Sequence, residues 1–331
     1  AIAQILKRET KMIDAFGDFV DLGPIKQEVE SDDDEESKSD SLQNTRWKED
    51  FTIPTVSAYI RTEEGRPEKN YFSCGVFEKI QTKEKWHGKS DYIEEDDNSR
   101  IFAQTQRVAS DIYNLYGVVT PKIELSVENP INCAFPHMEN NKAYTSVHIM
   151  TEIIPEFESY KKACGKKLKL TGMNTDDWIQ LKTKETLKEK GLGAILAVGL
   201  FINDKNTIGR NGCNVGFIKK SNAGKGAVQS VKVDPFEPFD DLDGNESLRN
   251  IPISCIQNQK PETVTFESLN KRVRDEFIAT VKAIVKTDEK VFKELFARKG
   301  LIEFITEKED IAKKLIERQK KLKSTYEKEF Q

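Results

Sequence analysis

Residues 51–80 alternate between apolar and polar residues, and most of the second half of the chain follows helical spacing. Two alternating segments, TIPTVSAYIRT and NYFSCGVFEKIQ, flank the turn-forming EEGRPEK within residues 51–80. This pattern predicts a β-hairpin. The charged segment after it, KEKWHGKSDYIEEDDNS, predicts a loop. Further strands are expected in VVTPKIELSV and in AYTSVHIMTEII, where Pro155 ends the second.

A helix is predicted between the hairpin and those strands, over residues 100–116. Apolar side chains recur there at helical spacing, and Gly117 is a stop signal. The recurring positions are Phe102, Val108, Ile112 and Leu115.

The second half predicts mainly helices, with short strands at 214–218 and 228–233. The helices are expected at 178–182, 186–201, 266–285, 288–298, 302–306 and 309–330. This order predicts an α+β protein with two lobes: a small strand-rich N-lobe with one main helix, and a larger helical C-lobe. We place the N-lobe at 51–155 and the C-lobe at 156–331. A cleft between two lobes commonly holds a ligand.

Residues 1–50 are expected to lie outside both lobes. Ala1 to Phe19 have helical spacing, and Ile25 to Asn44 are acidic, rich in serine and free of aromatic residues. This composition predicts a disordered linker, with an acidic partner-binding tail as the alternative.

Composition narrows the class of protein. The net charge of the 331 residues is −4, which gives no general attraction for nucleic acid, and no run of 18 apolar residues predicts a membrane span. The five cysteines are scattered without a CxxC pair, and the three histidines lie far apart. A disulfide framework and structural zinc are therefore not expected, and a reducing cytosol is the expected compartment.

Three polar residues form the main candidate for chemistry. Asp204 follows an apolar run in GLFINDKNTIGRNGCNVGFI, Asn214 comes ten residues later, and Asp234 closes the strand SVKVD. Phosphoryl transfer uses such a set: one carboxylate orients the attacking hydroxyl, while an amide oxygen and a second carboxylate hold Mg²⁺ on the phosphates. Taken singly, each is an ordinary turn residue. A calcium loop is disfavoured because Ile208 and Val215 occupy ligand positions.

Two further segments are candidates for binding. In SVHIMTEIIPEF, the backbone around Glu152 and Ile154 is suited to hydrogen-bond an adenine edge. The C-terminal helix is strongly basic, which suits an acidic partner or a phosphoinositide at a membrane surface. A solvated helix face is the alternative. The basic residues are Lys313, Lys314, Arg318, Lys320, Lys321 and Lys323.

The chain resembles the atypical protein-kinase-like fold, in particular the divergent lipid- and protein-kinase-like effector domains of intracellular bacteria. The stretches that carry the resemblance are VASDIYNLYGVVTPKIEL, SVHIMTEIIPEF, LGAILAVGLFINDKNTIGRNGCNVGFI and VKVDPF. They are similar to the regulatory helix with its following strand, the hinge, the catalytic loop and the metal-binding strand.

The resemblance implies an ATP- and Mg²⁺-dependent phosphotransferase. Asp204 would be the catalytic carboxylate, Asn214 and Asp234 the metal ligands, and Glu152 and Ile154 the hinge contacts. The acceptor would be a protein hydroxyl or a phosphoinositide. For a secreted effector, the host cytosol would be the location.

Departures from the kinase pattern support a pseudokinase interaction module as the alternative function. Cys74 stands where a phosphate-binding lysine is expected, so Lys79 is the candidate on that strand. Gln106 replaces the helix glutamate, and the strand segment before it lacks a glycine-rich loop. Losing a group that stabilises phosphate charge can cost roughly 10²–10³ in rate.

Overall fold

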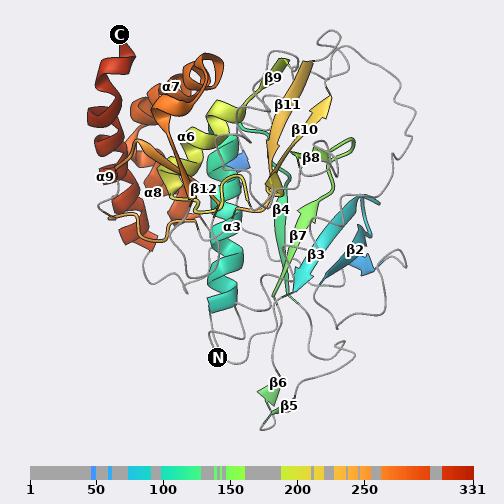
Figure 1. Ribbon diagram of the computed structural model, residues 1–331. Coiled ribbons are helices and arrows are strands. Elements are labelled where there is room, and N and C mark those ends of the chain that lie inside the picture. Colours follow the sequence, from blue (N-terminus) through green and yellow to red (C-terminus); the bar gives the residue numbers. More distant parts are fainter. Residues whose placement is uncertain are drawn as a thin grey trace.

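The computed structural model joins a five-stranded sheet to a half built mainly of helices, with helix α3 between them (Figure 1). The structure describes residues 46–49, 59–61, 74–90, 98–127, 138–139, 142–143, 147–160, 188–209, 212–219, 227–235, 238–244, 247–254, 262–298 and 308–331. The predictions for residues 1–44 and for helices at 178–182 and 302–306 lie outside these ranges.

The N-lobe sheet is antiparallel throughout, with strand order β1-β2-β3-β7-β4. The predicted hairpin is confirmed, because β1 pairs with β2. The predicted charged loop is wrong, because it contains the central strand β3. The strands are β1 (Tyr59–Arg61), β2 (Cys74–Lys79), β3 (Lys85–Ser90), β4 (Ile123–Val127) and β7 (Val147–Glu152).

The sequence pattern did not predict strand β3 because its only large apolar residue is Trp86, which is 1% exposed. Trp86 packs with Met150 and Phe77 in a small cluster on one face of the sheet. Gly88 lies between them, and a Cβ there would come within 2.5 Å of the Phe77 ring. The strand is thus fixed by contacts with its neighbours rather than by its own hydrophobicity.

Helix α3 (Asn98–Leu115) covers the other face of this sheet, close to the predicted bounds. Ile123 and Ile149 belong to the same core cluster as α3 residues Val108 and Ile112. Its C-terminal half is buried on several sides, because the C-lobe packs against it as well. The helix therefore contacts both lobes.

An arginine cluster fixes α3 to the segment before the N-lobe. Asp111 of α3 accepts hydrogen bonds from Arg46 Nε at 3.1 Å and from Arg298 Nη1 at 2.8 Å. Arg46 belongs to the 3₁₀ helix η1 (Arg46–Lys48), while Arg298 follows α8. Three elements distant in sequence thus meet at one carboxylate.

A second sheet, β8-β10-β11-β9, follows the loop of interest, and β12 of the separate β12-β13 pair packs beside α6 (Figure 1). The predicted strands at 214–218 and 228–233 are confirmed as β10 and β11, but the expected helix at 186–201 begins only after strand β9. The bounds are β8 (Glu158–Ser159), β9 (Lys188–Lys190), β10 (Val215–Lys219), β11 (Ala227–Lys232), β12 (Asn250–Ser254), β13 (Glu262–Thr265) and the small pair β5 (Met138–Glu139) and β6 (Lys142–Ala143).

The helical half is built around α6 (Leu192–Ile202), which is almost completely buried. Both its ends are satisfied by other helices. Glu276 accepts the Gly191 and Gly193 amides at 3.1 Å, and Arg318 donates to the Leu200 carbonyl at 2.9 Å. Such pairing removes the cost of burying orphan backbone groups. The surrounding helices are α7 (Lys271–Lys286), α8 (Glu289–Ala297) and α9 (Lys308–Tyr326), with the 3₁₀ helices η4 (Phe266–Ser268) and η5 (Glu327–Phe330).

The arrangement confirms an α+β protein with two lobes. Helices expected at 288–298 and 309–330 are found as α8 and as α9 with η5. The helix expected at 266–285 instead starts at residue 271, because Asn270 caps it by accepting the Val273 amide at 3.0 Å. Within the described ranges, no helix is long and apolar enough to cross a bilayer.

Candidate functional site

Asp204 lies directly after α6, in a buried loop, and its side chain is enclosed by donors. Its Oδ2 contacts Lys232 Nζ at 3.1 Å and accepts the Tyr113 hydroxyl at 2.9 Å, while Oδ1 accepts the Asn206 amide at 3.1 Å. Asp204 and Lys232 are both 0% exposed. The expected carboxylate open to an acceptor is therefore instead part of a closed ion pair.

Tyr113 brings α3 into this network. Burial, and then the charge of Asp204, raise the pKa of the Tyr113 hydroxyl well above its usual value. The hydroxyl thus keeps its proton and remains a donor to Asp204 at physiological pH. Through this bond the helix that covers the N-lobe sheet is coupled to the loop after α6.

The close approach of these groups depends on a glycine in α6. A Cβ on Gly199 would lie 2.3 Å from Thr207 Oγ1 and 3.0 Å from the Tyr113 hydroxyl. Thr207 itself donates to the Asp204 carbonyl at 2.7 Å. A glycine at this position lets the loop turn back against the helix.

Asn214 lies on the same loop and is 4% exposed. Its amide nitrogen donates to the Asn206 carbonyl at 3.0 Å, and its Oδ1 accepts the Cys213 thiol at 3.1 Å. The ten-residue spacing is absorbed by a turn held against β12, because Ile208 and Gly209 both donate to the Ile253 carbonyl. The sequence had suggested this insertion without the strand that supports it.

Asp234 follows β11, next to Asn214. The Val233 amide donates to the Asn214 carbonyl at 2.9 Å, which fixes the two segments side by side. Asp234 has a left-handed backbone, with φ of 49°, and is partly exposed. The chain therefore turns sharply at the carboxylate.

The hinge segment carries a backbone donor suited to a ligand. The Ile153 amide donates to the Lys85 carbonyl at 3.2 Å, and the Glu152 amide to the Lys122 carbonyl at 2.9 Å. The Glu152 side chain accepts the Lys122 amide at 3.1 Å. Among the described residues, no hydrogen bond engages the Ile154 amide.

Lys79 lies on the side of the sheet away from α3. Its Nζ contacts both Glu124 oxygens at 2.9 Å and sits 5.2 Å from the centre of the Trp86 ring. Trp86 belongs to the cluster opposite α3. This placement does not bring Lys79 together with Asp204, Asn214 or Asp234.

Strand β3 offers a different lysine, which the loop prediction concealed. Lys89 pairs in register with Ile149 of β7. Recognising β3 from the sequence would have required the Trp-x-Gly alternation in KWHGKS to be given weight over its charges.

Lys232 and Tyr113 were also missed in the sequence. Lys232 looked like an ordinary charged residue of an alternating strand, and Tyr113 like part of an amphipathic helix. Only the position of Lys232, two residues before Asp234, gave a signal.

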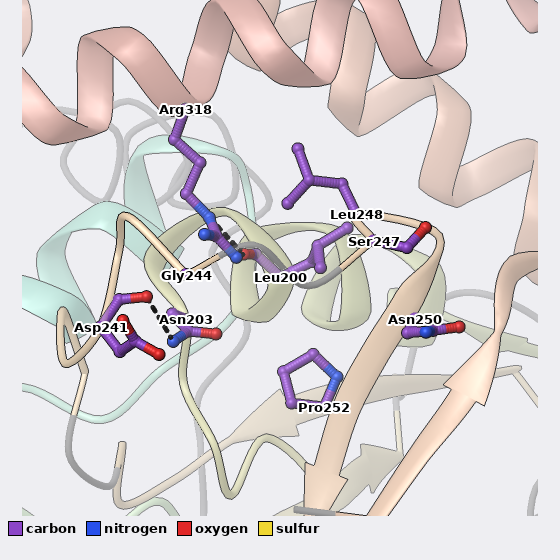
Figure 2. A pocket seen from close by; sticks show the side chains of 9 residues that line it. All are labelled: Leu200, Asn203, Asp241, Gly244, Ser247, Leu248, Asn250, Pro252 and Arg318. Carbon is purple, nitrogen blue, oxygen red and sulfur yellow. Dashed lines mark hydrogen bonds between the residues drawn. The ribbon is translucent and has the colours of Figure 1, made fainter.

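A pocket lies at the C-terminal end of α6, between the helix, residues of 241–244 and 247–252, and α9 (Figure 2). Arg318 points into it and bonds the Leu200 carbonyl, while Asn203 donates to the carbonyls of Asp240 and Asp241. Arg318 of the predicted basic stretch lines this pocket, whereas the residues expected to bind nucleotide or metal, or to act in catalysis, do not. Its groups close the C-terminus of α6.

The basic residues of α9 do not form one free face. Arg318 is buried, Lys314 pairs with Asp243 and Asp310, and Lys320 pairs with Glu289. The remaining members of the predicted basic stretch, Lys313, Lys321 and Lys323, are exposed.

Comparison with known proteins identifies the architecture. No family model matches the sequence, and no curated protein does. The crystal structure of the Helicobacter pylori proinflammatory kinase CtkA aligns over 83% of this chain and 96% of that one, at 13% identity and a TM-score of 0.53. The BubR1 kinase domain covers 96% and 98% of the two chains at 11% identity, but its TM-score of 0.26 carries no weight. The chain therefore has a kinase-like fold.

Proposed function

We propose that the protein is an ATP- and Mg²⁺-dependent phosphotransferase. The proposal rests mainly on the hydrogen bond from the Val233 amide to the Asn214 carbonyl, which sets Asn214 beside Asp234 in a kinase-like fold. An amide oxygen and a carboxylate are hard ligands that suit Mg²⁺. The described residues contain no cluster of three or more His, Cys, Asp or Glu side chains for a metal. Phosphate oxygens and water would complete the shell, as in other sites for Mg²⁺-nucleotides.

The nucleotide would bind between the hinge and this pair. The Ile154 amide and the Glu152 carbonyl would hold the adenine edge, and Lys89, rather than Lys79, would meet the phosphates, because kinases carry this lysine on the strand corresponding to β3. Bound Mg²⁺ would neutralise charge on the phosphates during transfer.

The acceptor would be a protein hydroxyl or a phosphoinositide head group. Lys313, Lys321 and Lys323 are exposed on α9 and would support contact with an anionic membrane surface. Activity in the cytosol, including a host cytosol for a secreted effector, is part of this proposal.

A pseudokinase is the second candidate, and the closed state of Asp204 favours it. Orientation of an acceptor by Asp204 would require release from Lys232 and Tyr113. Breaking a buried ion pair is costly, because each separated charge stays desolvated. The catalytic role of Asp204 therefore stays a prediction.

The test compares Asp234→Ala with Asp275→Ala, a control at an exposed carboxylate on α7. Calorimetric titration with ATP should show binding that depends on Mg²⁺ in the wild-type protein and in the control. Binding should be lost in Asp234→Ala with an unchanged melting temperature. Equal Mg²⁺-ATP affinity in both variants would remove Asp234 from the site.

Transfer is measured separately, with γ-labelled ATP and the protein itself, water, protein mixtures or inositol lipids as acceptors. Transfer of phosphate to any of these acceptors would support the proposed phosphotransferase. Binding of ATP without transfer to any of them would favour the pseudokinase.

A further inference from the structure

We propose that Lys232 is a positioning residue for the metal site: through Asp204 and the Asn206 carbonyl it sets the orientation of Asn214. This inference rests on the proposed function, because it concerns the same pair of metal ligands. It assigns Asp204 a role that needs no contact with an acceptor.

Lys232 connects two segments that must be held together. On one side, its backbone amide donates to the Val119 carbonyl at 2.9 Å, which fixes the end of β11 to the segment after α3. On the other, its Nζ reaches Asp204 Oδ2 at 3.1 Å and the Asn206 carbonyl at 3.5 Å. The strand that ends at Lys232, two residues before Asp234, is thereby tied to the loop that leads to Asn214.

The Asn206 carbonyl is the junction of this network. It accepts the Asn214 amide nitrogen at 3.0 Å and lies at the limit of bonding distance from Lys232. Because a carbonyl can only accept, it selects the nitrogen of the Asn214 side chain and directs the oxygen away. The Asn206 amide is fixed in turn by Asp204 Oδ1.

The freed oxygen is the atom that a cation needs. Asn214 Oδ1 accepts only a thiol from Cys213 at 3.1 Å among the bonds of the described residues, and a thiol is a weak donor. An amide oxygen with such a partner loses little when a hard cation takes its place. The network thus presents the ligating atom before any metal arrives.

Tyr113 connects helix α3 to this hydrogen-bond network. Its hydroxyl donates a hydrogen bond to Asp204, so a shift of α3 would displace Asp204 and, through it, Asn206 and Asn214. Gln106, at the position where the resemblance implies a glutamate, is buried on the same helix. The Tyr113 bond therefore offers a different route by which the helix and the metal ligands are coupled.

The experiment measures the affinity of the full chain for Mn²⁺-ATP and for metal-free ADP, together with hydrogen exchange of the amides of residues 204–216. Lys232→Met should weaken Mn²⁺-ATP binding by about 10- to 100-fold, as expected for a residue that supports a metal ligand. Metal-free ADP affinity should be unchanged, and the amides around Asn206 and Asn214 should exchange faster. Tyr113→Phe should show the same pattern at a smaller size.

Two further variants separate positioning from stability. Lys232→Met leaves Asp204 buried without its cation, so this variant is expected to be less stable than the wild type. The double variant Asp204→Asn with Lys232→Met removes both charges and should regain melting temperature without regaining Mn²⁺-ATP affinity. Lys232→Arg should restore part of the affinity, and Lys290→Met, an exposed control on α8, should behave as wild type.

The outcomes are distinct. If the wild-type protein binds no metal-nucleotide, the proposed function fails and the positioning role fails with it. If the wild type binds, but folded Lys232→Met or the double variant binds Mn²⁺-ATP equally well, only the positioning inference is wrong. The inference would also be overturned if Lys232→Met weakened metal-free ADP binding as much as Mn²⁺-ATP binding, since the effect would then not concern the metal ligands.

Discussion

Asp111 and Asp204 are both buried carboxylates beside α3, and their partners differ in kind. Asp111 is 2% exposed and lies among Arg46, Arg298 and, at 3.9 Å, Arg107. Asp204 is 0% exposed and has one ammonium, one hydroxyl and one backbone amide. The first site has more cations than carboxylates, while the second is balanced.

The guanidinium groups of the first site spread their bonds over the backbone. Arg46 also donates to the carbonyls of Ser110 and Thr120 and to both their hydroxyls, and Arg298 donates to the Leu295 carbonyl. An arginine presents five fixed donors, so it can join several segments at once. This geometry suits a permanent clamp between η1, α3 and α8.

Lys232 is more dependent on its single carboxylate partner. Its Nζ has Asp204 at 3.1 Å and the Asn206 carbonyl at 3.5 Å, with the Tyr113 ring 5.8 Å away. An ammonium is a compact charge on a flexible stem, whereas the planar guanidinium of arginine holds several acceptors in a fixed geometry. The Asp204 site therefore depends on fewer contacts than the Asp111 site.

The largest expected effect is that of Asp111→Ala on stability. Removal of this carboxylate leaves buried guanidinium groups uncompensated, and breaking such a cluster costs about 3–5 kcal/mol. Urea unfolding of the variant, with Asp275→Ala as an exposed control, measures the change. A loss of unfolding free energy below about 1 kcal/mol is close to that of an ordinary surface substitution. It would show that backbone acceptors alone are enough to satisfy the buried arginines.

Asp204→Ala is expected to act mainly on activity. Phosphate transfer should fall by about 10²-fold or more, with near-normal affinity for metal-free ATP. Its destabilisation should be smaller than that of Asp111→Ala, because it leaves the single ammonium of Lys232 without its carboxylate, whereas Asp111→Ala leaves more than one guanidinium group. Full turnover in the variant would show that Asp204 has only a turn-forming role, and equal destabilisation by the two variants would contradict the contrast between the two carboxylates.

Gly199→Ala should perturb the packing around Asp204 and leave the arginine cluster around Asp111 unchanged. The new methyl group would lie 2.3 Å from Thr207 Oγ1, within a packed helix, and overpacking of this kind costs about 1–3 kcal/mol. Gly244→Ala is a suitable control, since its nearest neighbour at 2.8 Å is the exposed Asp241 carboxylate. Thermal unfolding of the two variants checks this, and equal melting temperatures would argue against tight packing at Gly199.

Alkaline pH should produce the smallest effect. Burial raises the pKa of Tyr113, Tyr116 and Tyr326 above the usual value of about 10. Above about pH 10 the unfolded chain loses tyrosine protons that the folded protein keeps, so stability falls as pH rises. Below that pH the contribution is complete.

Melting temperatures between about pH 8 and pH 11 test this expectation, with Tyr116→Phe as a variant that should flatten the decline. A melting temperature that stays constant above about pH 10 would contradict the expected fall in stability.

Local pattern was enough for many elements of the fold. Helix α3 has its apolar residues at helical spacing and Gly117 after it, and α8 has Asp288 as its cap, which accepts the Lys290 amide at 2.8 Å. The strands β10 and β11 alternate over several residues. In each case the signal lies within one turn or one strand, where short-range sterics and backbone hydrogen bonding decide.

Strands β3, β9 and β12 were hidden because their stability comes from neighbours. A polar strand such as β3 is held by register with β2 and β7 and by the packing of Trp86. Residues 188–190 form a parallel pair with β11 that sequence spacing does not reveal. Context of this kind outweighs β-propensity, which is weak by comparison.

By itself, the sequence determined the order of lobes and the grouping of Asp204, Asn214 and Asp234 on one stretch of chain. Tertiary structure alone decided which of these side chains are open and which are enclosed. Tyr113 and Lys232 lie 91 residues before and 28 residues after Asp204, yet both bond the same oxygen. Desolvation and pairing depend on what surrounds a charge in three dimensions, so a residue list cannot distinguish a catalytic carboxylate from a buried anchor.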